Sequence, residues 1–321
     1  MTESIVCPTE SIVRTLFSRV LSKLLPSWIY SSLQESFGRS RVERIEYQLW
    51  LIDEQLRRLN RAIAADQFPG RSPRRGSALN DHELTIFSQN GEDGILGYIF
   101  NEIGVESASF VEVGVSHGFE CNTAYLALER GWRGILIDGD HGRVAEARRR
   151  YSDLLDQGSG QVVFRQAFIS AENFSDLLLA EGVGPVIDLL SLDIDGNEYW
   201  IWKGLEGIHA RVVVVEYNAS FGADRALTIP YDPHFQRNLA DPLNHGASLA
   251  ALTKLGKTKG YSLVGCDSMG ANAFFVRSDQ VKGPLKELDV AQAWMPHARR
   301  LRHTTQIEQE RRARKYPLVE V

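Results

Sequence analysis

Three acidic residues stand where apolar runs of the sequence end, and carboxylates at such positions can do chemistry. Asp138, Asp193 and Glu216 each close a run of strand-forming residues. An unpaired carboxylate is costly to bury, so a ligand crevice at the strand ends explains these acids better than a core position does. There they could accept hydrogen bonds from a ligand, take up a proton or hold a hard cation.

The stretch that leads to Asp138 indicates what such a crevice would bind. Residues 110–115 are strand formers, a turn with Gly114 and Gly118 follows, and a helical pattern runs over 121–130. Strand, glycine turn, helix, strand and carboxylate make up the front half of a nucleotide-binding sheet. The glycines are expected to let a ligand approach the backbone, and Asp138 to accept hydrogen bonds from ribose hydroxyls.

Charge distinguishes two cofactors that suit this geometry. The turn Gly114-Val115-Ser116-His117-Gly118 lacks the middle glycine of the G-x-G-x-x-G pattern that holds a pyrophosphate, and Glu112 lies two residues before it. A carboxylate repels a pyrophosphate but attracts the sulfonium and ammonium groups of S-adenosylmethionine. The sequence therefore favours S-adenosylmethionine over NAD.

A series of motifs follows in order across residues 80–278: Ser88 to Asp93, Phe110 to Gly114, Cys121 to Thr123, Gly131 to Gly134 and Ile137 to Asp140. This series resembles the FkbM-type methyltransferases, a branch of the Rossmann-like, class I S-adenosylmethionine enzymes. Many members of that family act on sugar or polyketide hydroxyls. The chain has Val-Ser-His-Gly where the family often has Ala-Asn-Asp-Gly.

The resemblance implies a set of cofactor-binding residues. Glu112 and Gly114 would hold the methionine end of the cofactor, Asp138 the ribose, and Phe168 would flank the adenine. Gln89 and Asn122 would fix the polar tail. The full expected set is Gln89, Glu112, Gly114, Ser116, Asn122, Asp138, Gly139, Phe168 and Asp193.

Two mechanisms fit the acceptor side, where a hydroxyl group needs activation at neutral pH. In the first, Asp193, Glu216 or His245 removes the hydroxyl proton. In the second, Asp193, Glu216 and Asn218 hold Mg²⁺, which acidifies the hydroxyl. The second resembles metal-dependent macrolide-sugar O-methyltransferases such as TylF, although those have paired aspartates where this chain has Glu216-Tyr217.

The acceptor itself is expected under a loop. Residues 218–245 lack periodicity and contain three prolines, which is typical of a functional loop or lid. Aromatic residues on this loop and on the preceding helix could stack on a sugar. The expected substrate contacts are Tyr199, Trp200, Asn218, Phe221, Tyr231 and His234.

Alternating strand and helix patterns predict an α/β fold with a Rossmann-like, seven-stranded, mostly parallel sheet and an antiparallel C-terminal hairpin at 261–277. The expected methyltransferase domain spans 80–283. A basic extension follows at 284–321, and its cluster of cations between Arg299 and Lys315 is expected to lie on a solvated terminal helix.

The region before the domain has a different character. An α-helical region is predicted over 1–63, and a linker rich in Pro, Gly, Ser and Arg over 64–79. Apolar residues from Val42 to Ile63 alternate steps of three and four, which predicts a coiled-coil seam and a homo-oligomer; packing on the helix at 11–25 is the alternative. That basic amphipathic helix could instead contact a membrane surface.

Composition limits the classes of function. The net charge is −5, and because residues 1–75 carry twelve cations and eight anions, the remainder carries −9. This acidic body argues against nucleic acid as a partner. Three scattered cysteines and the lack of a secretory signal favour the cytoplasm, with peripheral contact at the inner membrane face as an addition.

Together these features predict an S-adenosylmethionine-dependent O-methyltransferase that acts on a sugar hydroxyl of a glycan, glycolipid or glycosylated metabolite. An NAD-dependent sugar-nucleotide oxidoreductase and a non-catalytic oligomeric scaffold are the alternatives.

Overall fold

The computed structural model describes residues 78–118, 120–154, 161–238 and 240–321. The predictions for 1–63, which are the helical region, its self-association and the membrane contact, lie outside the described residues. So does the linker apart from its last two residues, which begin a short 3₁₀ helix, η1 (Ala78–His82).

Seven strands form one sheet in the order β3-β2-β1-β4-β5-β8-β7. Every neighbouring pair is parallel except those that involve β8, which runs antiparallel to both β5 and β7. The predicted Rossmann-like sheet with its C-terminal antiparallel hairpin is confirmed. The strands are β1 (Ser109–Val113), β2 (Arg133–Asp138), β3 (Val162–Gln166), β4 (Val186–Leu192), β5 (His209–Glu216), β7 (Tyr261–Cys266) and β8 (Asn272–Arg277).

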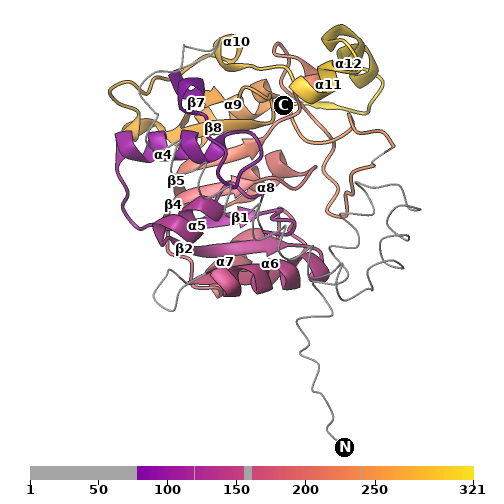
Figure 1. Cartoon of the computed structure of the whole chain (residues 1–321). Coiled ribbons are helices and arrows are strands. Elements are labelled where there is room, and N and C mark those ends of the chain that lie inside the picture. The colour runs from indigo at the N-terminus through magenta and orange to yellow at the C-terminus, as the bar shows by residue number, and fades with distance from the viewer. Residues whose placement is uncertain (1–77, 119, 155–160, 239) are drawn as a thin grey trace, which may run out of the picture. The chain divides into compact units, whose positions relative to one another are not determined.

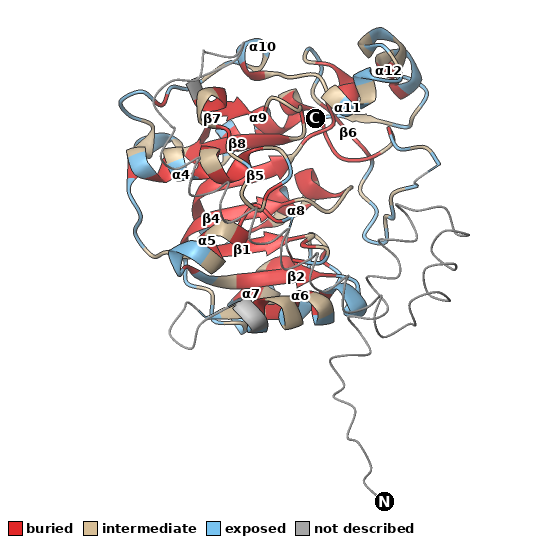
Figure 2. Cartoon of the chain, in the orientation of Figure 1, coloured by how far each residue is buried: buried red, intermediate tan, exposed pale blue. Residues whose placement is uncertain are grey.

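Helices cover both faces of the sheet, which gives three layers (Figure 1). Successive residues of a strand point to opposite faces, so Phe110 packs with one helix layer and Val111 with the other. Figure 2 shows the buried strands between partly exposed helices. The first layer holds α4 (Glu92–Ile103), α5 (Ala124–Arg130) and α6 (His141–Leu154); the second holds α7 (Phe174–Ala180), α8 (Glu198–Gly204) and α9 (Leu249–Thr258).

Helix α6 shows how few apolar residues a surface helix needs. Its sequence is rich in arginine, yet Val144, Ala147 and Tyr151 are buried. These three residues are three and four positions apart, so they share one face of the helix. That narrow stripe packs on the sheet, while arginines such as Arg143 and Arg148 lie at the surface.

The C-terminal residues from 284 pack on the same body rather than forming a separate extension, although the expected helix within 299–315 is present as α12 (Gln306–Ala313) and is partly exposed. Leu285, Ala293 and Ala313 are buried. Strand β9 (Val319–Glu320) pairs antiparallel with β6 (Leu227–Thr228) in the loop after β5. The other short elements of this part are η2 (Ala219–Phe221), η3 (Ser278–Gln280), α10 (Val290–Ala293) and α11 (Ala298–Leu301).

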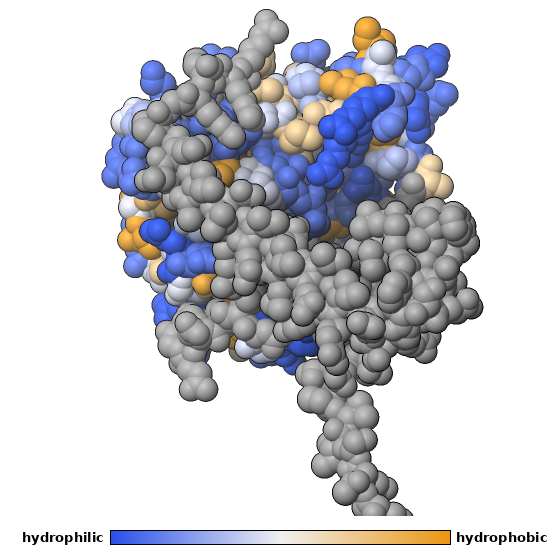
Figure 3. All heavy atoms as spheres, in the orientation of Figure 1, coloured by the Kyte–Doolittle hydropathy of each residue, from blue (hydrophilic) through white to orange (hydrophobic). Residues whose placement is uncertain are grey.

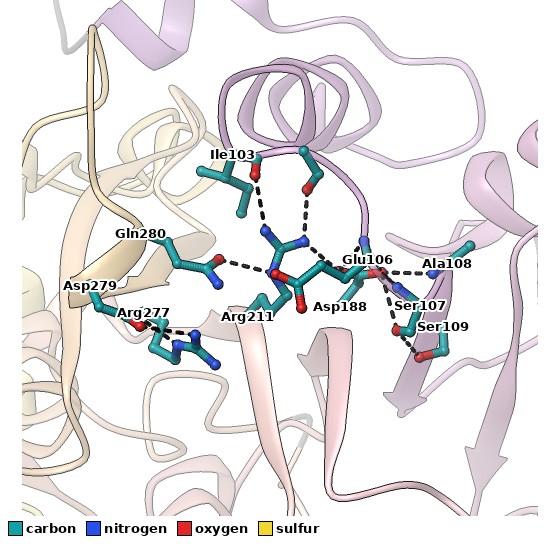
Figure 4. Close-up of polar contacts among 11 residues, drawn as sticks. Ile103, Glu106, Ser107, Ala108, Ser109, Asp188, Arg211, Arg277, Asp279 and Gln280 are labelled. Carbon is teal, nitrogen blue, oxygen red and sulfur yellow. Dashed lines mark hydrogen bonds and ion pairs between the residues drawn. The ribbon is translucent and has the colours of Figure 1, made fainter.

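An ion pair links β4 and β5 inside the protein (Figure 4). Arg211 Nη1 lies 2.7 Å from Asp188 Oδ1, and both side chains are at most 3 % exposed. The carboxylate of Asp188 also accepts hydrogen bonds from the N–H groups of Glu106, Ser107 and Ala108. Burial alone would raise the pKa of Asp188, but Arg211 and these N–H groups hold it below its usual value. The pair ties the loop before β1 to the central strands.

The described surface in Figure 3 is mainly hydrophilic, with hydrophobic residues scattered over it. Among the helices that the structure describes, none combines the length and the apolar sequence needed to cross a bilayer.

Candidate active site

The carboxyl ends of β1, β4 and β5 converge on one cavity of about 300 Å³. This is the edge where ligands bind in open α/β sheets. The predicted site residues Gln89, Glu112, Gly114, Asn122, Asp193 and Glu216 all line this cavity.

The cavity is strongly charged. Its lining includes Glu112, Asp193 and Glu216, which were expected from the sequence. It also includes three acids that were not expected, Glu92, Glu120 and Asp195. Arg237, Arg299 and His297 contribute basic groups from the loop after β5 and from the C-terminal segment.

Gly114 is required by the fold as well as by any ligand. Its φ is +90°, a conformation that favours glycine, and an added Cβ would lie 1.5 Å from the carbonyl oxygen of Asp193. The ends of β1 and β4 therefore approach each other too closely for any side chain at this position. The expected approach of a ligand is therefore not needed to explain glycine at this position.

Glu112 caps the start of α5. Its carboxylate accepts hydrogen bonds from the N–H of Asn122 at 2.8 Å, from the N–H and hydroxyl of Thr123, and from Ser191 Oγ at 3.1 Å. Burial raises the pKa of Glu112, and these four hydrogen bonds oppose that effect. Since the four donors use the lone pairs of the carboxylate, its negative charge rather than a direct hydrogen bond reaches the cavity.

Two further predicted residues are fixed by contacts beside the cavity. Gln89 donates to Glu120 at 3.1 Å, and Asn122 Nδ2 donates to Ser191 at 3.1 Å. Both side chains face the cavity, but only Asn122 is buried.

The residues expected to hold ribose and adenine lie outside this cavity. Asp138 accepts one N–H from Ser116 and one from Asp140, each at 2.9 Å, so each oxygen retains a free lone pair. Phe168, just after β3, is 49 % exposed, and its ring lies 3.3 Å from the position that a Cβ on Gly139 would take. An aromatic face and an acceptor thus flank the ends of β2 and β3.

Asp193 and Glu216 form the ionisable centre of the cavity. Burial, and then Glu198 and Glu112, raise the pKa of Asp193 to about 7, although Arg237 opposes the shift. Burial, and then Asp193 and Glu198, raise the pKa of Glu216 well above its usual value. Two neighbouring carboxyls that are largely removed from water do not readily ionise together, so the pair retains a proton near neutral pH.

Glu198 shapes the turn that carries Asp193. One carboxylate oxygen of this buried residue accepts the N–H groups of Ile194 and Gly196, at 3.0 and 2.8 Å. Asp195, between them, has a φ of +58° and pairs with Arg237. The tight turn explains the Asp-Gly-Asn-Glu sequence as a local structural requirement.

The loop after β5 is held over this turn. Asn197 Nδ2 donates to the carbonyl of Asp232 at 2.7 Å, and the ring of Phe235 lies 2.4 Å from the position of a Cβ on Gly196. The expectation of an ordered loop over the strand ends agrees with these contacts.

The aromatic and histidine residues that were expected to contact a substrate are buried, hydrogen-bonded elsewhere or outside the cavity. Tyr199 is buried in the core, Trp200 donates to the carbonyl of Ile229, and Tyr231 bonds to Ala171 and Glu172. Phe221 lines a second cavity of about 230 Å³ beside α12, and His234 is exposed. None of these five residues lines the cavity at the strand ends.

The metal set expected from the sequence does not come together. Asn218 Oδ1 accepts hydrogen bonds from the N–H of Ser220 and from Arg300, and Nδ2 donates to the carbonyls of Leu243 and His245. The Asn218 amide is therefore committed inside the protein and does not line the cavity. Its position makes it a structural residue rather than a cation ligand or a substrate contact.

His245, expected as a candidate base, is buried beneath Glu216. Its Nδ1 lies 3.9 Å from Glu216 Oε2, and its Nε2 lies 2.8 Å from Arg300 Nη2. Burial, and then Arg237, Arg300 and His297, lower the pKa of His245 well below its usual value, so the ring is neutral. Sequence reasoning had no signal for Arg237, His297 or Arg300, because only the tertiary fold brings them here.

No protein-family model and no curated protein matches the chain, so the resemblance to the FkbM-type enzymes rests on the sequence motifs alone. Solved structures that are similar include the N-terminal domain of EvdMO1 with SAH bound, at 14 % identity and a TM-score of 0.39, over 60 % of this chain and 81 % of that one. Rv0187 from MTB, with cofactor bound, is 18 % identical with a TM-score of 0.38, over 63 % and 86 % of the two chains.

A third similar structure is an S-adenosylmethionine-dependent methyltransferase from Clostridium acetobutylicum ATCC 824, at 10 % identity and a TM-score of 0.38, over 59 % of this chain and 92 % of that one. Likenesses at this level carry no information on substrate or reaction. The fold assignment follows from the strand order itself.

Proposed function

We propose that this chain is an S-adenosylmethionine-dependent O-methyltransferase that acts on a sugar hydroxyl. The observation that carries the proposal is the paired carboxyl site of Asp193 and Glu216 in a cavity that also borders the β1 turn. Bound S-adenosylmethionine would supply an electrophilic methyl group on a sulfonium. The chain would supply the negative field, the alignment and the proton acceptor.

The cap on α5 supports a sulfonium cofactor over a dinucleotide. A pyrophosphate needs free N–H groups at the first helix, yet the N–H groups of Asn122 and Thr123 are taken by Glu112. In the turn itself, the N–H of Ser116 is taken by Asp138 and that of Gly118 by the carbonyl of Val115. A pyrophosphate would be repelled by the Glu112 carboxylate and would find few free N–H donors. The cationic methionine end of S-adenosylmethionine would be attracted by the same carboxylate.

The residues suited to the two ends of the cofactor lie on neighbouring strand ends. Asn122 and Glu112 would face the methionine end, and Asp138 and Phe168 would take the ribose and adenine. Gln89 would bind the polar tail, after its bond to Glu120 opens or in addition to it.

The acid pair would act as the proton acceptor for the acceptor hydroxyl. A base works best when its pKa lies near the working pH, and the value of about 7 for Asp193 meets that condition. Either carboxylate can accept the hydroxyl proton while the second carboxyl keeps the shared one. Positioning the hydroxyl against a fixed electrophile contributes the larger share of the rate.

Magnesium is not part of the proposal. Two carboxyls that share a proton and lie among Arg237, Arg300 and His297 provide a poor set of ligands for a hard dication, and Asn218 cannot complete it. Methyl transfer should therefore survive chelation.

A transfer assay tests the proposed function. Labelled methyl from S-adenosylmethionine is offered to sugars, nucleotide sugars and oligosaccharides, with and without EDTA. The wild type should label at least one hydroxyl, and the double variant Asp193→Asn, Glu216→Gln, which retains neither proton acceptor, should label it about 10²- to 10⁴-fold more slowly. Loss of activity in EDTA, restored by Mg²⁺, would contradict the metal-free base.

Self-association through residues 42–63 belongs to the same proposal, as does a cytoplasmic location. Light scattering on the full chain and on a chain lacking residues 1–77 distinguishes a monomer from an oligomer. An oligomer that becomes a monomer on deletion is expected, and a monomeric full chain would contradict the prediction.

A further inference from the structure

Helix α11 of the C-terminal segment places a partly buried arginine against the buried His245. Arg300 Nη1 donates to Asn218 Oδ1 at 2.8 Å and to Ser220 Oγ at 2.9 Å, and Nη2 lies 2.8 Å from His245 Nε2. The segment is held in place nearby, because Tyr217 donates its hydroxyl to the carbonyl of Met295 at 2.7 Å. Arg300 thus contacts three residues of the loop that begins at the end of β5.

The contact with His245 determines where the imidazole carries its hydrogen. A guanidinium can only donate, so Nε2 must accept. A protonated ring would carry a hydrogen on Nε2 as well and could not accept from Arg300, so the buried ring is neutral and its single hydrogen lies on Nδ1. A neutral histidine in water favours the opposite form, with the hydrogen on Nε2, so the Arg300 contact selects the less common tautomer.

The Nδ1 atom faces Glu216. It lies 3.9 Å from Glu216 Oε2, and within the described residues both atoms are buried and have no hydrogen-bond partner. With its hydrogen on Nδ1, the ring presents a donor to the carboxyl and has no lone pair on that side. His245 cannot then take a proton from an acceptor in the cavity.

The same tautomer keeps His245 from binding a cation. One ligand atom each of Asp195, Glu216 and His245 lie within 4.8 Å of one another, which is a spacing that suits a metal ion. Ligation through Nδ1 requires its lone pair and moves the hydrogen to Nε2. That hydrogen would then point at the guanidinium of Arg300, donor against donor, at 2.8 Å.

We propose that Arg300 is a positioning residue that holds His245 in the Nδ1–H form, directed at Glu216, and so prevents these residues from forming a metal centre. For its role in the reaction this inference rests on the proposed function, since it assigns proton uptake to the acid pair alone. The tautomer and the exclusion of a cation do not depend on that function.

Nitrogen NMR on the full chain with ¹⁵N-labelled histidine measures the tautomer directly. The eight histidines of the chain are sorted with a His245→Gln variant, whose missing signals identify residue 245. The wild type should show a protonated Nδ1 and an unprotonated Nε2. Arg300→Leu should lose this pattern, Arg300→Lys, which retains one donor, should keep it, and Arg302→Leu, at an exposed neighbour, should leave it unchanged.

Titration with Co²⁺, followed by calorimetry, tests the second part of the proposal, that Arg300 prevents a metal ion from binding. Arg300→Leu should bind Co²⁺ about 10- to 100-fold more tightly than the wild type, and adding His245→Gln should abolish the gain. Equal Co²⁺ affinity in both proteins, or a wild-type His245 with its hydrogen on Nε2, would overturn the inference.

Affinity for S-adenosylhomocysteine separates this inference from the proposed function and reports on folding. It should be unchanged in the Arg300 variants. If the wild type fails to bind S-adenosylhomocysteine, the proposed function fails while the tautomer result stands. If Arg300→Leu does not fold, the wild-type spectrum and the Lys variant still decide the tautomer.

Discussion

Glu112 provides a sharp test of how the β1 end is built. The residue lines the cavity and was expected to hold the cofactor, yet its contacts make it the cap of α5. Replacing it with glutamine keeps the shape and removes one acceptor oxygen. Whichever way the amide is turned, its NH₂ group faces the N–H of Asn122 or of Thr123, and one of these buried donors loses its partner.

The cost follows from the contacts. An unpaired buried N–H costs about 1–3 kcal/mol, and the two hydrogen bonds that remain each weaken by about 1 kcal/mol when the acceptor loses its charge. Glu112→Gln should therefore lower the free energy of unfolding by about 3–5 kcal/mol. Asn122 and Thr123 are at most 5 % exposed, so water cannot replace the lost acceptor.

Thermal denaturation without cofactor measures this loss. At roughly 2–4 °C per kcal/mol for a domain of this size, the midpoint should fall by roughly 6–20 °C. The control is Glu120→Gln, the same change at an exposed residue of the same cavity, which should shift the midpoint by less than about 2 °C. Unchanged stability in Glu112→Gln, with lost affinity for S-adenosylhomocysteine, would refute the cap and restore the direct cofactor contact.

Further predictions concern the backbone, the interior ion pair and the strand-end acids. Gly114→Ala should lose about 2–5 kcal/mol of stability in urea denaturation, because the new Cβ meets a carbonyl, whereas Gly131→Ala, where a Cβ meets open space, should lose about 1 kcal/mol. Asp188→Ala should lose about 3–5 kcal/mol, because it removes a buried ion-pair partner of Arg211 and leaves the N–H groups of Glu106, Ser107 and Ala108 without their acceptor. The same change at the exposed Asp279 should lose less than about 1 kcal/mol, and similar losses would contradict this difference. The lowered pKa of Asp188 means that its contribution is complete above the unfolded pKa and is lost as the pH falls through the folded one, which acid denaturation of the wild type and variant measures. Methyl transfer should decline as the pH falls below about 7, because the acid pair then gains its second proton, and a flat rate between pH 6 and 8 would exclude this base.

The sequence was sufficient for the sheet because each strand carries its own signal. Apolar runs such as 186–192 and 209–216 lie between glycine turns and helical patterns, and the parallel order follows from their alternation. Of the three acids at the ends of such runs, Asp193 and Glu216 lie close together and line one cavity, since parallel strands end on one edge of the sheet. Asp138 lies outside that cavity, although β2 ends on the same edge.

Side-chain roles could not be predicted in the same way. Glu112 looked like a ligand group because sequence shows its position on a strand but not the N–H groups of the helix that follows. The aromatic residues on and near the loop looked like a sugar platform, yet Tyr199 and Trp200 pack inside or bond to the loop backbone. Arg300 carries no local signal at all, because a contact across 55 residues of sequence to His245 depends on how the C-terminal segment folds back.

Binding of S-adenosylhomocysteine tests the central claim most directly. Calorimetry on the full chain compares S-adenosylhomocysteine with NAD⁺ and NADH, for the wild type and for Asp138→Ala, which removes the expected ribose acceptor. Binding of S-adenosylhomocysteine alone, weakened at least about tenfold in the variant, is the predicted result. Binding of NADH with no response to S-adenosylhomocysteine would contradict the assignment of this site to a sulfonium cofactor.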